Sequence, residues 1–240
     1  KRQVWYGAHL VDSGDMTIGD IGAFISYLMQ ILFSVMMATM AVILIPRAAA
    51  SAERIAEVLD VQPAITDPAS PRPQPDPGSI VFRNVNFRYP GAEEPVLHDI
   101  DFEVRRGEFT AIVGGTGSGK TTIIGLIARF FDVSDGQVLV GGTDVREQSL
   151  DTLYRSIGLV PQRAYIFGGT IRDNVTFGAP QLTDDEVWHA LEIAQAADYV
   201  REFEDGLDHE IAQGGQNLSG GQRQRLAIAR ALALRPDIYI

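Results

Sequence analysis

Residues 114–122 read Gly114-Gly115-Thr116-Gly117-Ser118-Gly119-Lys120-Thr121-Thr122, which matches the pattern G-x-x-x-x-G-K-[ST]. We expect the apolar residues 109–113 to form a short buried strand before this stretch, and residues 121–131 to form a helix after it. Glycines let the backbone turn tightly and approach an anion closely. The loop N–H groups and the positive end of the following helix dipole would then hold phosphate oxygens. The stretch therefore predicts a phosphate-binding loop in an α/β domain.

Two side chains of this loop have specific roles in the pattern. The Lys120 ammonium lies beside the β- and γ-phosphates of a bound nucleotide, and the Thr121 hydroxyl binds Mg²⁺. The alternative is a glycine-rich turn with an unrelated lysine, but such a turn would not need a strand before it and a helix after it.

The composition of the chain limits its partners. Its 240 residues allow one large domain or two smaller ones, and its net charge of −11 argues against nucleic acid, which attracts basic surfaces. The chain has no cysteine, so it has neither a disulfide framework nor a thiolate metal site. It opens Lys1-Arg2-Gln3 without an initiator Met or a secretory signal, and residues 238–240 begin an apolar run that does not continue. We expect a fragment of a longer protein.

Residues 21–45 contain no charged side chain and are numerous enough to cross a bilayer as a tilted helix. An acidic loop precedes them and Arg47 and Arg54 follow, so the positive-inside rule puts the C-terminal end in the cytoplasm. The alternative is a buried helix of a soluble protein. We expect the polar side chains of a membrane helix to face other helices or a wet cavity. These side chains are Ser26, Gln30, Ser34 and Thr39.

Three segments follow from these patterns. Residues 1–60 are expected to be the C-terminal piece of an all-α membrane domain, in which Pro46 kinks the helix at the membrane boundary and residues 47–59 extend it into the cytoplasm. Residues 61–79 carry six prolines and predict an extended linker. Residues 80–240 predict an α/β domain with strands at 80–89, 97–104, 138–140 and 157–160, and a capped helix after Thr183.

A second glycine motif occurs about 100 residues after the phosphate loop. Residues 218–222 read Leu218-Ser219-Gly220-Gly221-Gln222, and a helical pattern follows to about Leu234. Ser219 is a suitable N-cap, and a helix N-terminus with two glycines is a second site for an anion. The motif alone predicts only a helix cap, but together with the phosphate loop it is far more specific.

The pair of motifs resembles the ATP-binding cassette (ABC) family, whose signature is LSGGQ, and the resemblance covers nearly the whole chain. It implies a P-loop nucleotide-binding domain at 80–240 that binds ATP and Mg²⁺. Tyr89 matches the aromatic residue that stacks on adenine, although the position also suits a core tyrosine. Gln162 matches the glutamine that contacts Mg²⁺ and faces the membrane domain. The segment 165–174 looks like the one that meets the coupling helices of the membrane domain.

The resemblance also implies partners and a location. Two cassettes close head to tail, so Ser219, Gly220, Gly221 and Gln222 would contact the ATP of a second half-transporter, identical or different. The N-terminal part looks like the end of the fifth and the sixth membrane helices of type I exporters, most like bacterial multidrug half-transporters. It implies a multi-pass protein of the inner membrane with its nucleotide-binding domain in the cytoplasm. The transported substrate is not written in the sequence.

Departures from the family pattern leave three functions open. The chain stops inside the expected Walker B strand, so no catalytic residue is present and the catalytic Glu would lie beyond Ile240. Gln213 stands where exporters commonly carry Glu.

The first function is the energising half of an ATP-driven exporter. The second is a regulatory half that binds ATP while its partner hydrolyses it. The third is a soluble cassette ATPase, against which residues 21–45 and the acidic charge both speak.

Overall fold

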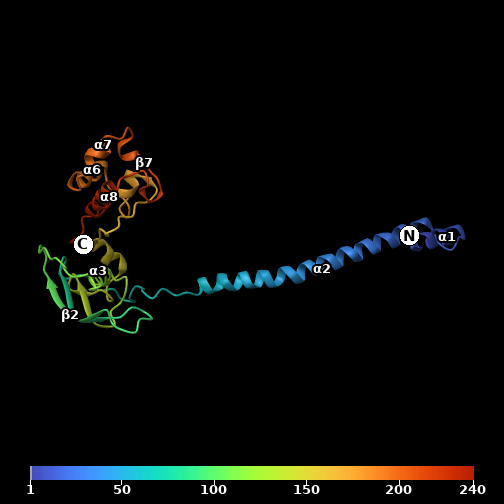
Figure 1. Cartoon of the computed structure of the whole chain (residues 1–240), viewed down its shortest axis with the longest axis horizontal. Helices are drawn as coiled ribbons and strands as arrows, with labels where there is room; N and C mark the ends of the chain where they lie inside the picture. The colour runs from blue at the N-terminus through green and yellow to red at the C-terminus, as the bar shows by residue number, and fades with distance from the viewer. Residues whose placement is uncertain (1) are drawn as a thin grey trace. The chain divides into compact units, whose positions relative to one another are not determined.

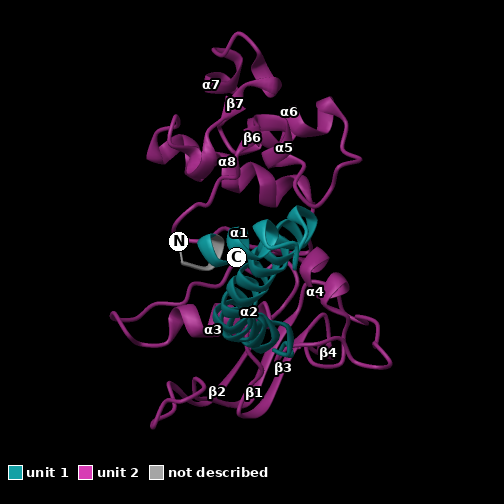
Figure 2. Cartoon of the chain, turned by 90° about the vertical axis from the view of Figure 1, so that its right-hand side faces the viewer, with its two compact units in different colours: residues 1–63 teal, residues 64–240 magenta. Residues whose placement is uncertain are grey.

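The computed structural model describes residues 2–240 and divides into two compact units, Lys1–Pro63 and Ala64–Ile240. Figure 1 shows the order of the helices and strands, and Figure 2 colours the two units. Unit 1 is helical, whereas unit 2 mixes helices with short sheets. The mixture of helices and strands in unit 2 and the long apolar helix before it agree with the α/β domain and the apolar helix expected from the sequence.

Unit 1 consists of helices α1 (Arg2–Asp12) and α2 (Ile18–Leu59). A capping box starts α2, because the Thr17 side chain accepts from the Asp20 N–H at 3.3 Å and Asp20 accepts from the Thr17 N–H at 2.9 Å. The helix has 42 residues, which span about 63 Å at 1.5 Å each, roughly twice the hydrocarbon thickness of a bilayer. It continues through Pro46 without a break.

The apolar part of α2 meets the length and composition required of a membrane span. Its most apolar window has a mean hydropathy of 2.3, and none of that window is buried. The hydroxyls of Ser26, Ser34 and Thr39 each donate to the carbonyl four residues earlier, at 2.8–2.9 Å. These hydroxyls are therefore satisfied within the helix, so they do not need the partners in other helices that the sequence suggested.

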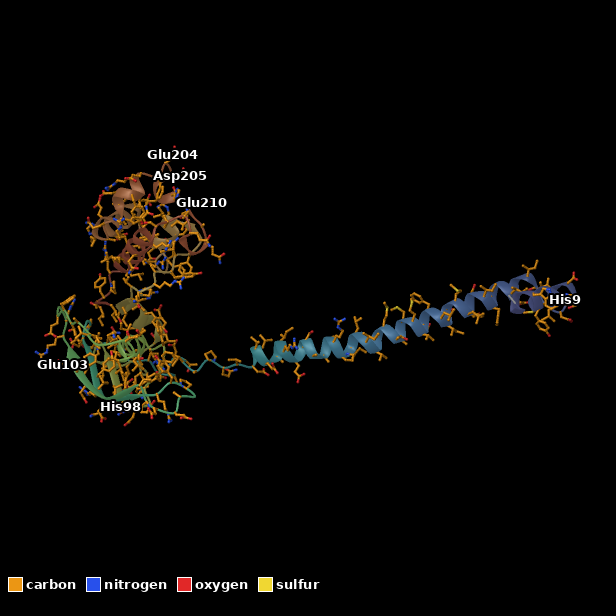
Figure 3. The ribbon with its side chains drawn as sticks, viewed as in Figure 1. His9, His98, Glu103, Glu204, Asp205 and Glu210 are labelled. Atoms are coloured by element: carbon orange, nitrogen blue, oxygen red, sulfur yellow. The ribbon has the colours of Figure 1, made fainter. Side chains whose placement is uncertain are left out.

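The first part of unit 2 is built on a four-stranded antiparallel sheet in the order β2-β1-β3-β4. The strands are β1 (Ile80–Phe87), β2 (Leu97–Val104), β3 (Asp135–Val140) and β4 (Thr143–Asp144). Helices α3 (Lys120–Ile127) and α4 (Leu150–Ser156) contribute apolar side chains to the same core as the sheet. Alternating residues of β1 enter one apolar core with side chains of β3 and α3, whereas His98 and Glu103 of β2 lie on the solvent side (Figure 3).

The second part of unit 2 is helical and has its own core. It contains α5 (Ile171–Val175), α6 (Asp184–Ile193), α7 (Ala197–Arg201) and α8 (Gly220–Ala233), with short strands β6 (Gly169–Thr170) and β7 (Glu210–Ile211) paired antiparallel. Single 3₁₀ turns cover Gly206–Asp208 and Gln213–Gly215. Strands β5 (Ile157–Gly158) and β8 (Ile238–Tyr239) pair in parallel. The exposed acids Glu204, Asp205 and Glu210 lie together at one end of this part (Figure 3).

Most predicted elements form, but two expectations about the phosphate loop are wrong. Residues 109–113 are not a buried strand: they are irregular, and Phe109 and Val113 are 96% and 87% exposed. A buried strand needs ladder hydrogen bonds and packing on its faces, and no strand of the described residues pairs with this run. The helix after the loop ends at Ile127 rather than at 131, because Arg129 takes a positive φ of 52°.

The Pro-rich segment has neither helix nor strand, yet residues 67–79 lie against the sheet part of unit 2. The Asp67 carboxylate accepts from the Leu150 N–H at 2.7 Å, at the start of α4. The Gln74 amide donates to the Gln148 side chain at 2.7 Å and to Ser156 at 3.2 Å. Gln148 is fully buried. Proline stiffens this segment in an extended form. Its polar groups therefore meet partners in residues 148–156 at fixed positions.

Candidate functional site

The phosphate loop forms the turn that leads into α3. Gly117 and Gly119 have φ values of 81° and 87°, in the left-handed region that favours glycine, and Gly119 is the N-cap of α3. A Cβ atom on Gly119 would lie 2.6 Å from Leu97 Cδ2 of β2. The position therefore requires glycine for its backbone conformation and for its close approach to β2.

The Lys120 ammonium is held inside the loop. It donates to the Gly114 carbonyl at 2.9 Å and to the Gly115 carbonyl at 2.6 Å, and it lies 3.3 Å from the Ser118 hydroxyl. These contacts place the Lys120 ammonium next to the loop 114–122. The N–H groups of this loop are the ones that the sequence predicts to bind phosphate. On nucleotide binding the ammonium would exchange carbonyl oxygens for phosphate oxygens, which bear more charge and bind a cation more strongly.

Thr121 and Thr122 follow the lysine and differ in exposure. Thr121 is exposed at the first turn of α3, where a hydroxyl suits a hard cation such as Mg²⁺, whereas Thr122 is buried. Among the described residues no three His, Cys, Asp or Glu side chains cluster around a possible metal.

The Tyr89 side chain lies beside the helix that follows the loop. Its hydroxyl is 3.0 Å from Thr122 Oγ1, and its ring is half-buried, edge-on to Phe87 at 4.8 Å and to Phe131 at 5.2 Å. Aromatic contacts of this kind orient a ring firmly. The structure thus brings Tyr89 to the phosphate loop.

Gln162 lies in the loop after β5. It is exposed and lines a groove of about 750 Å³ together with Arg163, Gly220 and Arg223. The structure therefore brings Gln162 to the same groove as the start of α8.

The LSGGQ motif is the N-terminus of α8, as the sequence predicts. Ser219 is the N-cap: its hydroxyl accepts from the Gln222 N–H at 3.3 Å, and its own N–H donates to the Gln222 side chain at 2.8 Å. Gly220 and Gly221 are exposed, and a Cβ on Gly221 would meet no atom within 4 Å. The first turn of a 14-residue helix thus offers backbone N–H groups and a positive dipole end to an anion.

Sequence reasoning did not identify three residues that support this helix. Arg223 donates to the Leu218 carbonyl at 2.6 Å and to the Gly215 carbonyl at 3.2 Å, so it fixes the loop before the motif. Arg230 donates to Asn174 and to Tyr165 O, and burial lowers the pKa of its guanidinium. Asn174 is 1% exposed. The available signal was a charged Arg230 between alanines on an otherwise apolar helix face.

Comparison with known proteins assigns the family. The family model described as "ABC transporter" matches residues 97–240, which include both glycine motifs. The chain belongs to the ABC transporter family.

Relatives of this ABC chain include exporters. It is 49% identical to an uncharacterized ABC transporter ATP-binding protein of Mycobacterium tuberculosis, over 99% of the chain and 41% of the relative. It is 37% identical to an ATP-dependent lipid A-core flippase of Desulfotalea psychrophila, over 99% of the chain and 41% of that protein. A bacterial Atm1-family ABC exporter solved with ATP bound is 33% identical, with a TM-score of 0.80 over 94% of the chain and 40% of that structure. The ABC chain thus spans about two fifths of these proteins.

Proposed function

We propose that this chain is the ATP-binding and energising part of an ABC exporter, which couples ATP binding and hydrolysis to substrate efflux across a membrane. The observation that carries the proposal is the presence of two helix N-termini preceded by glycine motifs, at Lys120 and at Gly220, in one unit that follows an apolar helix. The resemblance to exporters over nearly the whole chain supports it.

In this proposal the chain's own ATP lies at the phosphate loop. The loop N–H groups and Lys120 hold the phosphates, Tyr89 stacks on the adenine, and Thr121 with Gln162 binds Mg²⁺, which neutralises phosphate charge. Gln162 now lies in the groove beside α8.

A second half-transporter would supply the other face of the nucleotide. Ser219, Gly220, Gly221 and Gln222 would contact the partner's ATP through the first turn of α8. Closure of two cassettes would bury both nucleotides, because neither the phosphate loop nor the α8 N-terminus encloses a triphosphate alone. Hydrolysis would reset the pair.

The membrane part of the proposal concerns residues 1–60. Helix α2 would span the bilayer over residues 21–45 and extend into the cytoplasm over 47–59, as part of a multi-pass domain in the inner membrane. Residues 61–79 would then connect this domain to the nucleotide-binding domain at 80–240. The hydrogen bonds of Asp67 and Gln74 attach the second half of this segment to the nucleotide-binding domain.

Nucleotide titration tests the binding role. The chain in detergent or lipid nanodiscs should bind MgATP saturably, and Lys120→Ala should weaken that binding. Binding that is absent in the parent chain, or equal in both, would contradict the proposal. Fractionation of cells that express the chain checks the membrane role, because a soluble cassette ATPase would stay out of the membrane pellet.

The regulatory alternative needs a different observation. A catalytic Glu after the strand that contains Ile238 would support the energising half, whereas another residue there would support a half that binds ATP for its partner. Sequencing the gene beyond Ile240 separates these two functions directly.

A further inference from the structure

Arg230 connects helix α8 to the segment 165–177, which precedes it by more than fifty residues in the chain. Its Nε donates to the Asn174 carbonyl at 2.8 Å, its Nη2 donates to Asn174 Oδ1 at 2.8 Å, and its Nη1 donates to the Tyr165 carbonyl at 3.0 Å. The planar fork of an arginine matches several acceptors at once, so these bonds fix both position and orientation.

Asn174 makes the far side of this connection rigid. It is 1% exposed; its Nδ2 donates to the Phe167 and Thr170 carbonyls at 3.0 Å, and its Oδ1 accepts from the Phe167 N–H at 3.0 Å. The turn 167–174 is therefore closed around one buried amide. The same amide oxygen accepts from Arg230, so the turn cannot shift without disturbing α8.

Three exposed aromatic side chains lie next to one another near Arg230: Tyr165, Phe167 and Phe177, which we call the aromatic patch. They are 56%, 37% and 53% exposed. Phe167 and Phe177 stack on each other at 4.5 Å, and the Arg230 guanidinium carbon lies 5.1 Å and 5.9 Å from their ring centroids. The guanidinium therefore interacts with the rings of Phe167 and Phe177, which remain partly exposed to solvent.

Helix α8 carries this connection to the LSGGQ motif. Arg230 follows Gly220 by ten positions, which is about 15 Å of continuous helix. Arg223 and the Ser219 capping box fix the other end of the helix against the loop that precedes it. A displacement of the patch therefore reaches Gly220 and Gly221 through one rigid element.

We propose that Arg230 is a positioning residue, which joins the aromatic patch to the N-terminus of α8 so that the two move as one body. Its role is to set the position of the first turn of α8 when the patch is displaced. The coupling rests on the contacts of Arg230, whereas its consequence for ATP turnover rests on the proposed function.

Hydrogen exchange on the full chain tests the coupling without nucleotide. Phe177→Ala disturbs the patch, and the exchange rates of the Gln222 and Arg223 amides, which donate to Ser219 at the N-terminus of α8, are compared with and without Arg230→Met. We expect Phe177→Ala to change these rates about fivefold or more when Arg230 is present and to leave them unchanged in the Arg230→Met background. Equal responses in the two backgrounds would overturn the proposal.

A matched control separates coupling from stability. Arg201 lies 5.1 Å over the Trp188 ring and pairs with Glu192, partners that lie outside the segment 165–177, so Arg201→Met should leave the response to Phe177→Ala intact. If Arg230→Met does not fold, Arg230→Lys serves in its place, because lysine keeps a cation near Phe167 but lacks the fork. A lysine variant with the full parent response would contradict the role of the fork.

A kinetic measurement distinguishes this proposal from the proposed function. In the exporter that contains this chain, Arg230→Lys should lower kcat for ATP about tenfold with KM for ATP unchanged, since the phosphate loop is untouched. A rise in KM with kcat intact would overturn the positioning role. If the parent exporter itself does not hydrolyse ATP, the energising function fails, while the exchange experiment still decides the coupling.

Discussion

The hydroxyl of Tyr89 lies 3.0 Å from the Oγ1 of Thr122, although the two residues are 33 positions apart in the chain. Tyr89 follows β1, and Thr122 is in the first turn of α3. The contact connects the aromatic ring proposed to stack on adenine with the helix whose N-terminus is proposed to hold the phosphates. One hydrogen bond therefore sets the position of the two ends of the nucleotide site relative to each other.

Two substitutions at Tyr89 separate its ring from its hydroxyl. Tyr89→Ala removes the stacking surface and should weaken ATP binding by about 1–3 kcal/mol, the range for a base on an aromatic ring. Tyr89→Phe keeps the ring and should weaken it by only about 0.5–1.5 kcal/mol through the lost bond to Thr122. Calorimetric titration measures both. Inorganic triphosphate is the control ligand, because it lacks a base and its affinity should be the same in all three proteins.

Lys120 should account for most of the charge-dependent affinity of the loop. Lys120→Ala should weaken MgATP binding by about 1.5–3 kcal/mol, the range for hydrogen bonds to charged groups. Lys120 and Lys1 are the only lysines in the sequence, so amine acylation followed by peptide mapping reports on it directly. Bound ATP should slow acylation of Lys120 and leave Lys1 unaffected. Equal acylation with and without ATP would refute the assigned role.

Gly119 should tolerate no side chain. Gly119→Ala combines a φ of 87° with a Cβ 2.6 Å from Leu97 Cδ2, and we expect it to lower the free energy of unfolding by about 1–3 kcal/mol. Gly115→Ala is the matched control, because a Cβ there meets no atom within 4 Å and its φ is not positive. Urea denaturation compares them. Equal stability of the two variants would show that the close approach to Leu97 does not constrain the loop.

Gln74 should contribute to the stability of unit 2 even though it lies in the Pro-rich segment. Gln74→Ala leaves the buried Gln148 side chain without its partner at 2.7 Å, which should cost about 1–3 kcal/mol of unfolding free energy. Gln62, exposed and outside unit 2, provides the control substitution. A Gln74→Ala variant as stable as Gln62→Ala would mean that the segment is a free linker.

Tyr199 should make the stability of the helical part depend on alkaline pH. Burial raises the pKa of Tyr199 from 10.0 to about 12, and the nearby Arg225 opposes this rise. The unfolded chain ionises this tyrosine first, so its contribution is fully present below pH 10.0 and is lost as pH rises through about 12. Between these pH values the midpoint temperature of thermal unfolding should fall less steeply with rising pH for Tyr199→Phe than for the parent chain. Parallel curves for the variant and the parent would contradict the raised pKa.

Local patterns predicted many of the elements because local free energies decide them. The helix starts predicted at Thr183 and Ser219 both form as adjacent residue types dictate, and glycine takes positive φ in the phosphate loop. The same patterns failed for residues 109–113, because an apolar run becomes a strand only when another strand pairs with it. Residues 61–79 were predicted as an extended linker, but a window of sequence could not predict long-range contacts such as the hydrogen bond from Gln74 to Gln148, 74 positions away.

The sequence by itself determined the chemistry of this protein: a loop and a helix N-terminus that suit phosphates, an apolar helix long enough to span a bilayer, and membership of a family that both motifs identify. These features depend on residue types at short spacing, where backbone conformation and hydrogen bonding are local. Tertiary structure alone decided that Tyr89 meets Thr122, that Gln162 lies beside α8, and that Arg230 reaches Asn174 across 56 positions. Such contacts arise from packing of distant segments, whose free energy depends on the whole core rather than on any stretch of residues.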